Sequence, residues 1–400
     1  FETPDLWTVC ALADLVRRRM HGNVAYYNVN RHINYSNICA LSCKFCAFHR
    51  KRDQDGAYEY SLEDIRREVR KASAAGATEL HIVGGLHPWL KFDYYLDMLR
   101  TIREEAPEIH IKAFTAVEIV HLTRISKRGR LGYEGIKAVI RDLRDAGLGS
   151  LPGGGAEVFD DRVHDEVFKG KIRSDEWLDV HRAAHELGLN SNATMLYGHV
   201  EGEADRIRHL LLLREQQDAT LRAWAAAQRL DARPEPTLAG DAADAVVLYG
   251  PADQYPADRF PTPDTSKTGY FQTIIPLPFF PDASELEHLP GPSGLENLRT
   301  LAVCRLMLDN MPHVKAFWIM QTLDMAQLML QNGADDIDGT VVWYDITKVG
   351  GADTHQETSV WDLRRAIQEA GFEPVERDTI YRRVERDGPA WRVAEAVDAR

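Results

Sequence analysis

Residues 33–46 read INYSNICALSCKFC and decide the fold prediction, because a β-like segment at 33–38 runs directly into three cysteines. Cys39, Cys43 and Cys46 follow the pattern C-x3-C-x2-C, so one short loop directs three soft thiolates at a common centre. Three cysteines on a four-iron cluster leave one iron open to another ligand. The alternative is a Cys3His zinc site completed by His49. We favour the cluster because the loop follows a strand, where α/β barrels place their active sites.

A strand-then-helix pattern repeats along the chain on both sides of this loop. Residues that typically begin or end helices accompany the pattern, such as Ser61 and Asp64, which form a capping-box pair. The pattern predicts an α/β fold, a (βα)8 TIM-type barrel with chemistry in the loops that follow the strands. The predicted strands are residues 33–38, 78–84, 109–115, 150–152, 192–197, 271–276, 314–319 and 339–343.

The domain prediction is a barrel with additions. Residues 1–32 form an N-terminal segment, residues 33–345 the barrel, and residues 346–400 a short C-terminal extension that packs on it. Residues 219–268 interrupt the repeat with many Pro, Asp and Gly residues, and this composition predicts a surface insertion.

Charge and composition narrow the class of partner. The 400-residue chain has a net charge of -13, which disfavours binding to nucleic acid or to an anionic membrane. No apolar run approaches the roughly 20 residues that span a bilayer, and nothing near residue 1 resembles a signal peptide. Three of the five cysteines are clustered, which suggests metal rather than disulfides. We therefore expect a cytoplasmic enzyme that acts on a small molecule.

The cysteine motif resembles the signature of the radical S-adenosylmethionine (SAM) superfamily, with Phe45 in its aromatic position. The resemblance implies a [4Fe-4S] cluster on Cys39, Cys43 and Cys46, whose open iron chelates SAM, and cleavage of SAM to a 5'-deoxyadenosyl radical. A buried, water-poor pocket would control such a radical. Gly84 and Gly85 match two positions of the Gly-Gly-Glu element of the superfamily, whereas Leu86 replaces its acidic residue.

A finer resemblance, to the aminofutalosine synthase family of the futalosine route to menaquinone, covers nearly the whole chain outside the insertion. Two related families share the framework, the dehypoxanthine futalosine cyclases and a subunit of the deazaflavin coenzyme synthases. Those families usually have Ser-Pro where this chain has Thr115 and Ala116. The blocks that carry the resemblance are VNRHINYSNIC, CKFCAF, HIVGGLHP, HIKAFTAVEI, LPGGGAE, SNATMLYGH, QTIIPL, KAFWIM and GADDIDGTVV.

This resemblance implies a transferase that adds the radical to the enol ether double bond of 3-[(1-carboxyvinyl)oxy]benzoate. Aminofutalosine, methionine and bicarbonate would be the products, and SAM would be a co-substrate. An electron donor such as flavodoxin or ferredoxin would be the partner. Cyclase chemistry, the deazaflavin synthesis and a zinc-stabilised binding protein are the alternatives.

The candidate site residues lie at the predicted strand ends or in the loops that follow them, where a barrel gathers its active site. His87, Glu118 and Glu157 are the candidate catalytic residues, although loop histidines and rim ion pairs would look the same. Tyr197 could equally be a core tyrosine, and Lys171 and Arg173 solvated surface charges. The candidate cofactor-binding residues are Phe45, Gly84, Gly85, Thr115, Gly154, Glu157, Lys171, Arg173 and Tyr197.

Overall fold

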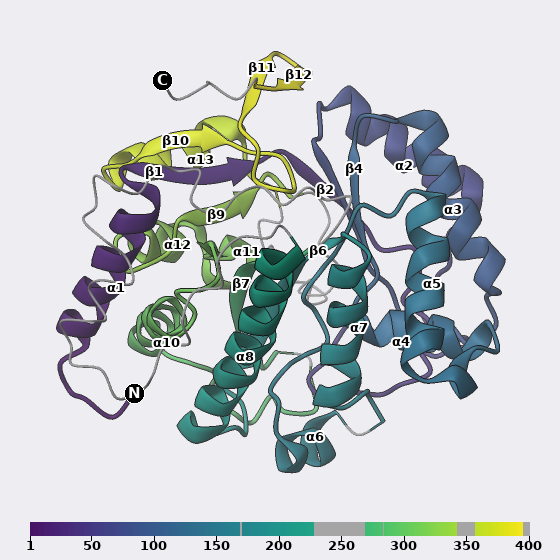
Figure 1. Ribbon diagram of the computed structural model, residues 1–400, viewed down its shortest axis with the longest axis horizontal. Helices are drawn as coiled ribbons and strands as arrows, with labels where there is room; N and C mark the ends of the chain where they lie inside the picture. Colours follow the sequence, from purple (N-terminus) through teal and green to yellow (C-terminus); the bar gives the residue numbers. More distant parts are fainter. Residues whose placement is uncertain (169, 228–268, 283, 342–356, 395–400) are drawn as a thin grey trace.

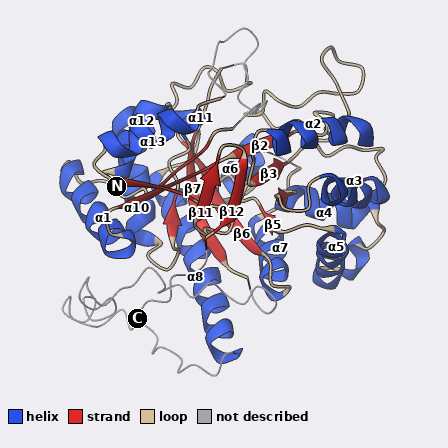
Figure 2. Cartoon of the chain, turned by 90° about the horizontal axis from the view of Figure 1, so that it is seen from above, coloured by secondary structure: helices blue, strands red, loops and turns tan. Residues whose placement is uncertain are grey.

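A curled parallel sheet forms the centre of the computed structural model, which describes residues 1–168, 170–227, 269–282, 284–341 and 357–394. Its seven strands follow one another in chain order, as expected for repeated βα units. Figure 2 shows these strands at the centre with helices around them. They are β2 (Asn30–Ile33), β3 (Glu79–Ile82), β4 (His110–Ala113), β5 (Ser150–Leu151), β6 (Asn190–Tyr197), β7 (Phe271–Pro278) and β8 (His313–Val314).

Amphipathic helices alternate with the strands and cover the outside of the sheet (Figure 2). The capping box predicted at Ser61 and Asp64 is present at the start of α2, where it satisfies backbone N–H groups of the first turn. The helices are α1 (Leu6–His21), α2 (Leu62–Ala74), α3 (Phe92–Glu105), α4 (Ala116–Ile125), α5 (Tyr133–Ala146), α6 (Asp161–Val167), α7 (Ser174–Glu186), α8 (Glu203–Ala227), α10 (Gly294–Met307), α11 (Trp318–Gln321), α12 (Leu323–Leu330) and α13 (Val360–Glu369).

A second sheet joins the two ends of the chain to the barrel. In it β1 (Val24–Asn28) lies between β9 (Asp336–Gly339) and β10 (Glu373–Glu376), and both neighbours run parallel to it. Figure 1 shows the purple β1 beside the yellow β10. A bridge between Lys315 and Asp336 links β8 to β9, and β1 continues through Val29 into β2. The open edges of the seven-stranded sheet are thus connected through β9 and β1.

The predicted barrel is confirmed as a curled parallel sheet covered by helices, but three predicted strands were misplaced. The strand predicted at residues 314–319 overlaps β8 only at Val314, and α11 begins within it at Trp318. The first strand ends at Ile33 rather than beginning there, because Ser36 and Ile38 make only isolated bridges in the loop that follows. The eighth strand lies at Asp336–Gly339 instead of residues 339–343, of which 342 and 343 lie outside the described residues.

The first residues of the predicted insertion, 219–227, belong to a helix. The helix α8 continues past residue 219, where the insertion was expected to begin, and residues 228–268 lie outside the described residues. The C-terminal stretch adds a hairpin of β11 (Val384–Asp387) and β12 (Ala390–Val393). Among the described helices, none is both long and apolar enough to cross a bilayer.

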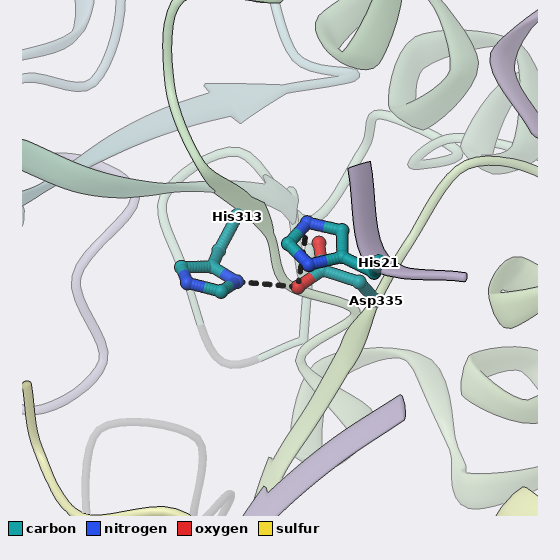
Figure 3. Close-up of side chains that lie close together, drawn as sticks. All are labelled: His21, His313 and Asp335. Atoms are coloured by element: carbon teal, nitrogen blue, oxygen red, sulfur yellow. Dashed lines mark hydrogen bonds and ion pairs between the residues drawn. The ribbon is translucent and has the colours of Figure 1, made fainter. Parts of the chain in front are cut away.

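Asp335, which directly precedes β9, binds several groups at the amino ends of the strands. Figure 3 shows Asp335 between His313, at the start of β8, and His21, at the end of α1. Its Oδ2 lies 2.6 Å from His313 Nδ1, and its Oδ1 accepts from the Arg305 guanidinium and, at 2.8 Å, from the Val314 N–H. These groups lie at the amino ends of parallel strands, opposite to the cysteine loop, so Asp335 stabilises the fold.

Candidate active site

The cysteine loop begins where β2 ends and closes on itself. The Cys39 N–H donates to the Arg50 carbonyl oxygen at 3.0 Å, and the Arg50 N–H donates to the Asn37 carbonyl oxygen at 2.9 Å. These two bonds hold the base of the loop, so that Cys39, Cys43 and Cys46 all line one cavity as free thiols. The three cysteines that were predicted to share one centre therefore line the same cavity.

That cavity lies at the carboxyl ends of the strands and has a volume of about 240 Å³. Its walls are mainly apolar, with Val83, Val117, Leu196 and Phe279 among them. A concave, largely apolar space with a few polar groups is the usual form of a small-molecule site. The predicted residues that it brings together with the cysteines are Phe45, Gly84, Gly85, Thr115, Glu118, Gly154, Glu157 and Lys171.

The three cysteines fit a soft metal cluster, because Cys43 is buried, Cys39 and Cys46 are partly buried, and backbone N–H groups reach the sulfur atoms of Cys39 and Cys46. Burial raises the pKa of Cys43 to about 12, although the Lys171 ammonium opposes this rise. Burial also raises the pKa of Cys46 against hydrogen bonds from the His49 and Phe48 backbones. A metal ligand must be a thiolate, and buried thiolates need compensating positive charge, which an iron cluster would supply.

An ion pair lies beside the cysteines. Lys171 is bound to the Glu157 carboxylate, and its Nζ lies 5.2 Å from the ring centre of Phe45 and 5.7 Å from that of Phe168. Burial alone would lower the pKa of Lys171, but the attraction of Glu157 and Cys43 outweighs it and the pKa is raised. Lys171 is therefore a buried cation, and the predicted surface alternative for it is wrong.

Glu118 joins the ends of two strands to each other. One carboxylate oxygen accepts from the Tyr35 hydroxyl at 2.8 Å and from the Gly84 N–H at 3.0 Å. The other accepts from the backbone and hydroxyl of Thr115, both at 2.8 Å, and so completes a capping box at the start of α4. Burial raises the pKa of Glu118 to about 7, against the effect of these hydrogen bonds.

The glycines of the strand ends are required by close packing against protein atoms. A Cβ on Gly84 would lie 2.6 Å from the Tyr35 ring, and one on Gly85 would lie 2.3 Å from the Ile38 carbonyl oxygen. Gly154 has more room, with its nearest contact to Thr115 at 3.1 Å. The first two glycines thus let the cysteine loop approach the end of β3.

Three predicted residues do not line the cavity. His87 is buried beside Glu59, 2.8 Å away, and burial lowers its pKa against the effect of that carboxylate. The Tyr197 hydroxyl donates to Asn297 Oδ1 at 2.8 Å. Arg173 forms two surface ion pairs with Asp161 and Asp165.

Residues that the sequence interpretation did not single out also line the cavity. Thr194 belongs to β6, and Asp282 follows β7 by a few residues. Asp282 lies beyond the carboxyl end of β7, where a barrel presents its site, so the strand-end rule points to it. Thr194 lies within β6, and the strand-end rule carries no signal for it. Apolar lining residues such as Leu277 carry no comparable signal, because apolar residues are frequent throughout strands.

Comparisons with known proteins give the family. The family model for the radical SAM superfamily matches residues 33–213, and the one for the CofH/MqnC C-terminal region matches residues 268–388. An aminodeoxyfutalosine synthase of Thermus thermophilus is 37% identical over 388 residues, which cover 96% of this chain and 90% of that protein. Another, of Streptomyces coelicolor, is 38% identical and covers 97% and 90%.

Two further similarities define the range of relatives. A 5-amino-6-(D-ribitylamino)uracil–L-tyrosine 4-hydroxyphenyl transferase of Methanopyrus kandleri is 31% identical, with coverage of 94% and 89%. The crystal structure of methylornithine synthase matches with a TM-score of 0.65 at 16% identity, covers 94% of this chain and 90% of that one, and so shares the fold. Radical SAM enzymes use a [4Fe-4S] cluster and SAM. This chain belongs to the radical SAM superfamily and is an enzyme homologous to the aminodeoxyfutalosine synthases.

Proposed function

We propose that this enzyme transfers the 5'-deoxyadenosyl group of SAM to 3-[(1-carboxyvinyl)oxy]benzoate and forms aminofutalosine. Methionine leaves from SAM, and the lost carboxyl carbon leaves as bicarbonate with an oxygen from water. The observation that carries the proposal is the identity of 37% and 38% to aminodeoxyfutalosine synthases over nearly the whole chain. The 4-hydroxyphenyl transferases reach 31% to 32% over a similar length, and their reaction is the second candidate.

In this proposal Cys39, Cys43 and Cys46 would hold the cluster. When reduced and with SAM bound, the cluster would supply one-electron cleavage of SAM. A one-electron donor such as flavodoxin or ferredoxin would be the partner that reduces the cluster. The apolar walls around the cysteines would limit water in the space in which the acceptor must meet the adenosyl group.

The charged residues of the cavity would orient SAM and the acceptor, which both carry carboxylates. Among the described residues that line the cavity, Lys171 is the only lysine or arginine. Because it lies beside the Cys43 loop and the Phe45 ring, we assign it to a carboxylate of SAM or of the acceptor, with Glu157 as the partner that holds its charge. Glu118 acts through Gly84 and Thr115 and keeps the strand ends in place.

The test is an oxygen-free incubation of the reconstituted enzyme with SAM, a reductant and 3-[(1-carboxyvinyl)oxy]benzoate, followed by mass analysis. We expect one product that contains the 5'-deoxyadenosyl group and the carbon skeleton of the acceptor without the carboxyl carbon that leaves as bicarbonate. In a parallel incubation with dehypoxanthine futalosine as the substrate, the release of free 5'-deoxyadenosine would instead indicate cyclase chemistry. Product formation only from 5-amino-6-(D-ribitylamino)uracil and tyrosine would indicate the second candidate function.

A matched pair of cysteine variants tests the proposed ligands. Cys43→Ser should lose the cluster and the adenosylated product, because a hydroxyl is a poor ligand for iron compared with a thiolate. Cys304→Ser changes a buried cysteine in α10 and should keep both. Iron and sulfide analysis after anaerobic reconstitution reads the cluster directly. A full cluster in Cys43→Ser would contradict the ligand assignment.

A further inference from the structure

A lysine binds the outer side of the cysteine loop through its backbone. The Lys51 Nζ lies 3.0 Å from the carbonyl oxygen of Cys39, 3.4 Å from that of Ala40 and 2.9 Å from that of Leu41. Three successive carbonyl groups thus converge on one ammonium group. Such charge-assisted hydrogen bonds are stronger than neutral ones, so they hold the backbone between the first two cysteines.

The backbone before Lys51 is itself anchored to the base of the loop. Arg50 pairs with both sides of Ile38, through its N–H to the Asn37 carbonyl oxygen and its carbonyl oxygen to the Cys39 N–H. Lys51 is the next residue, so its side chain begins at a fixed point beside Cys39. Its reach across the loop is therefore built into the fold.

The other basic residues of this segment bind the far end of the loop in the same way. His49 Nδ1 lies 2.9 Å from the carbonyl oxygen of Cys46, and an Arg50 nitrogen donates to the carbonyl oxygen of Ala47 at 2.8 Å. The segment 49–51 therefore places basic groups on carbonyl oxygens next to two of the three cysteines.

Peptide N–H groups reach the sulfur atoms themselves. The Leu86 N–H donates to Cys39 Sγ at 3.3 Å, and the Cys46 sulfur accepts from the backbone of Phe48 and His49. Hydrogen bonds to sulfur and nearby positive charge favour the reduced form of an iron–sulfur cluster, because reduction adds negative charge. The ammonium of Lys51 contacts the carbonyl of Cys39 itself and adds to this effect.

We propose that Lys51 is a positioning residue for the iron–sulfur cluster, which fixes the Cys39–Leu41 backbone for ligation and makes the cluster easier to reduce. The inference rests on the proposed ligation by Cys39, Cys43 and Cys46. It adds a residue outside the cysteine motif whose ammonium group contacts the backbone of the cysteine loop.

The experiment compares Lys51→Met, Lys51→Gln and Lys51→Arg with a control, Lys44→Met. Lys44 is an exposed lysine of the same loop, and its ammonium has no hydrogen bond or ion pair to any described residue. The control therefore removes one charge from the loop without removing a carbonyl contact. The readouts are iron and sulfide per chain after anaerobic reconstitution and the midpoint potential from an EPR-monitored titration.

We expect Lys51→Met to bind less iron than the wild type and to give a more negative midpoint potential, by a clearly larger shift than Lys44→Met. Lys51→Arg should restore both values because its guanidinium keeps the donors and the charge. Lys51→Gln keeps a hydrogen-bond donor without the charge, so its iron content and midpoint potential should lie between those of Lys51→Met and Lys51→Arg. Far-UV circular dichroism shows whether each variant is folded.

Two results would separate the possible failures. If the wild type binds a [4Fe-4S] cluster and Lys51→Met matches Lys44→Met in iron content and potential, the role of Lys51 is wrong and the proposed function stands. If the wild type binds no such cluster through its three loop cysteines, the proposed function fails and this inference fails with it.

Discussion

At the scale of single residues, Glu118 shows how burial and hydrogen bonding oppose each other. Four donor groups surround its carboxylate, and they favour the charged form. Burial disfavours that form more strongly and raises the pKa of Glu118 to about 7. The group therefore takes up its proton more readily in the folded protein than in the unfolded chain.

This difference predicts a pH dependence of stability. A raised folded pKa stabilises the protein fully below the ordinary value of 4.5, and this contribution is lost as the pH rises to about 7. The loss amounts to at most about 3 kcal/mol in the free energy of unfolding. Glu118→Gln should be less stable overall, because its amide nitrogen faces donor groups, but should lack this pH dependence.

Urea denaturation at several pH values measures the effect. The control is Glu63→Gln, which changes an exposed glutamate in the first turn of α2 and should keep the pH profile of the wild type. A Glu118→Gln variant with the wild-type profile would show that Glu118 does not titrate in this range.

At the scale of elements, Asp335 connects α1, β8 and β9 at the base of the barrel (Figure 3). Burial alone would raise the pKa of Asp335, but His21, His313 and Arg305 outweigh it and hold the pKa well below its ordinary value. Burial lowers the pKa of His21 to about 3, so this imidazole is neutral near pH 7. Arg305 is then the permanent counter-charge of Asp335.

Asp335→Asn should therefore destabilise the protein by about 3–5 kcal/mol, because it leaves the buried Arg305 guanidinium without its anion. The free energy of unfolding in urea measures the loss. Asp145→Asn is the matched control, since Asp145 pairs with Arg144 on the surface at 3.0 Å and should change stability by less than about 1 kcal/mol. Equal effects of the two substitutions would contradict the assigned role.

At the scale of the whole molecule, strands from the two ends of the chain form one sheet, in which β1 pairs with β9 and β10. The edge of β1 is covered by β10, and Arg377 beyond β10 forms a buried ion pair of 2.6 Å with Asp336 in β9. Tyr381 stacks on His313 at a ring distance of 3.5 Å. The C-terminal stretch thus contacts two strands that are about three hundred residues apart in sequence.

A chain truncated after Gly371 should lose these contacts together. We expect its midpoint of thermal unfolding to fall by roughly 5–10 °C or its cooperative transition to disappear, because Asp336 stays buried without Arg377. A chain truncated after Asp387 loses the turn before β12, β12 itself and the tail. Among the described strands β12 pairs only with β11, so the unfolding midpoint of this chain should change much less. Calorimetry of the two truncated chains compares them, and equal midpoints would contradict this prediction.

The sequence by itself determined the features whose physical cause is local. The cysteine spacing places three thiols in one short loop, and the Ser61 cap needs only its own helix. The order of strands and helices follows from local periodicity in the same way, so the parallel barrel could be predicted.

Only the tertiary structure decided which loop residues face the cavity and how the sheet ends meet. His87 follows the end of β3 and Tyr197 is the last residue of β6, as predicted. Their side chains nevertheless bind Glu59 and Asn297, which are distant in sequence, and do not line the cavity. The pairing of β1 with β9 and β10 likewise depends on residues hundreds of positions apart. Side-chain direction and sheet closure are set by such distant partners, and a local pattern carries no information about them.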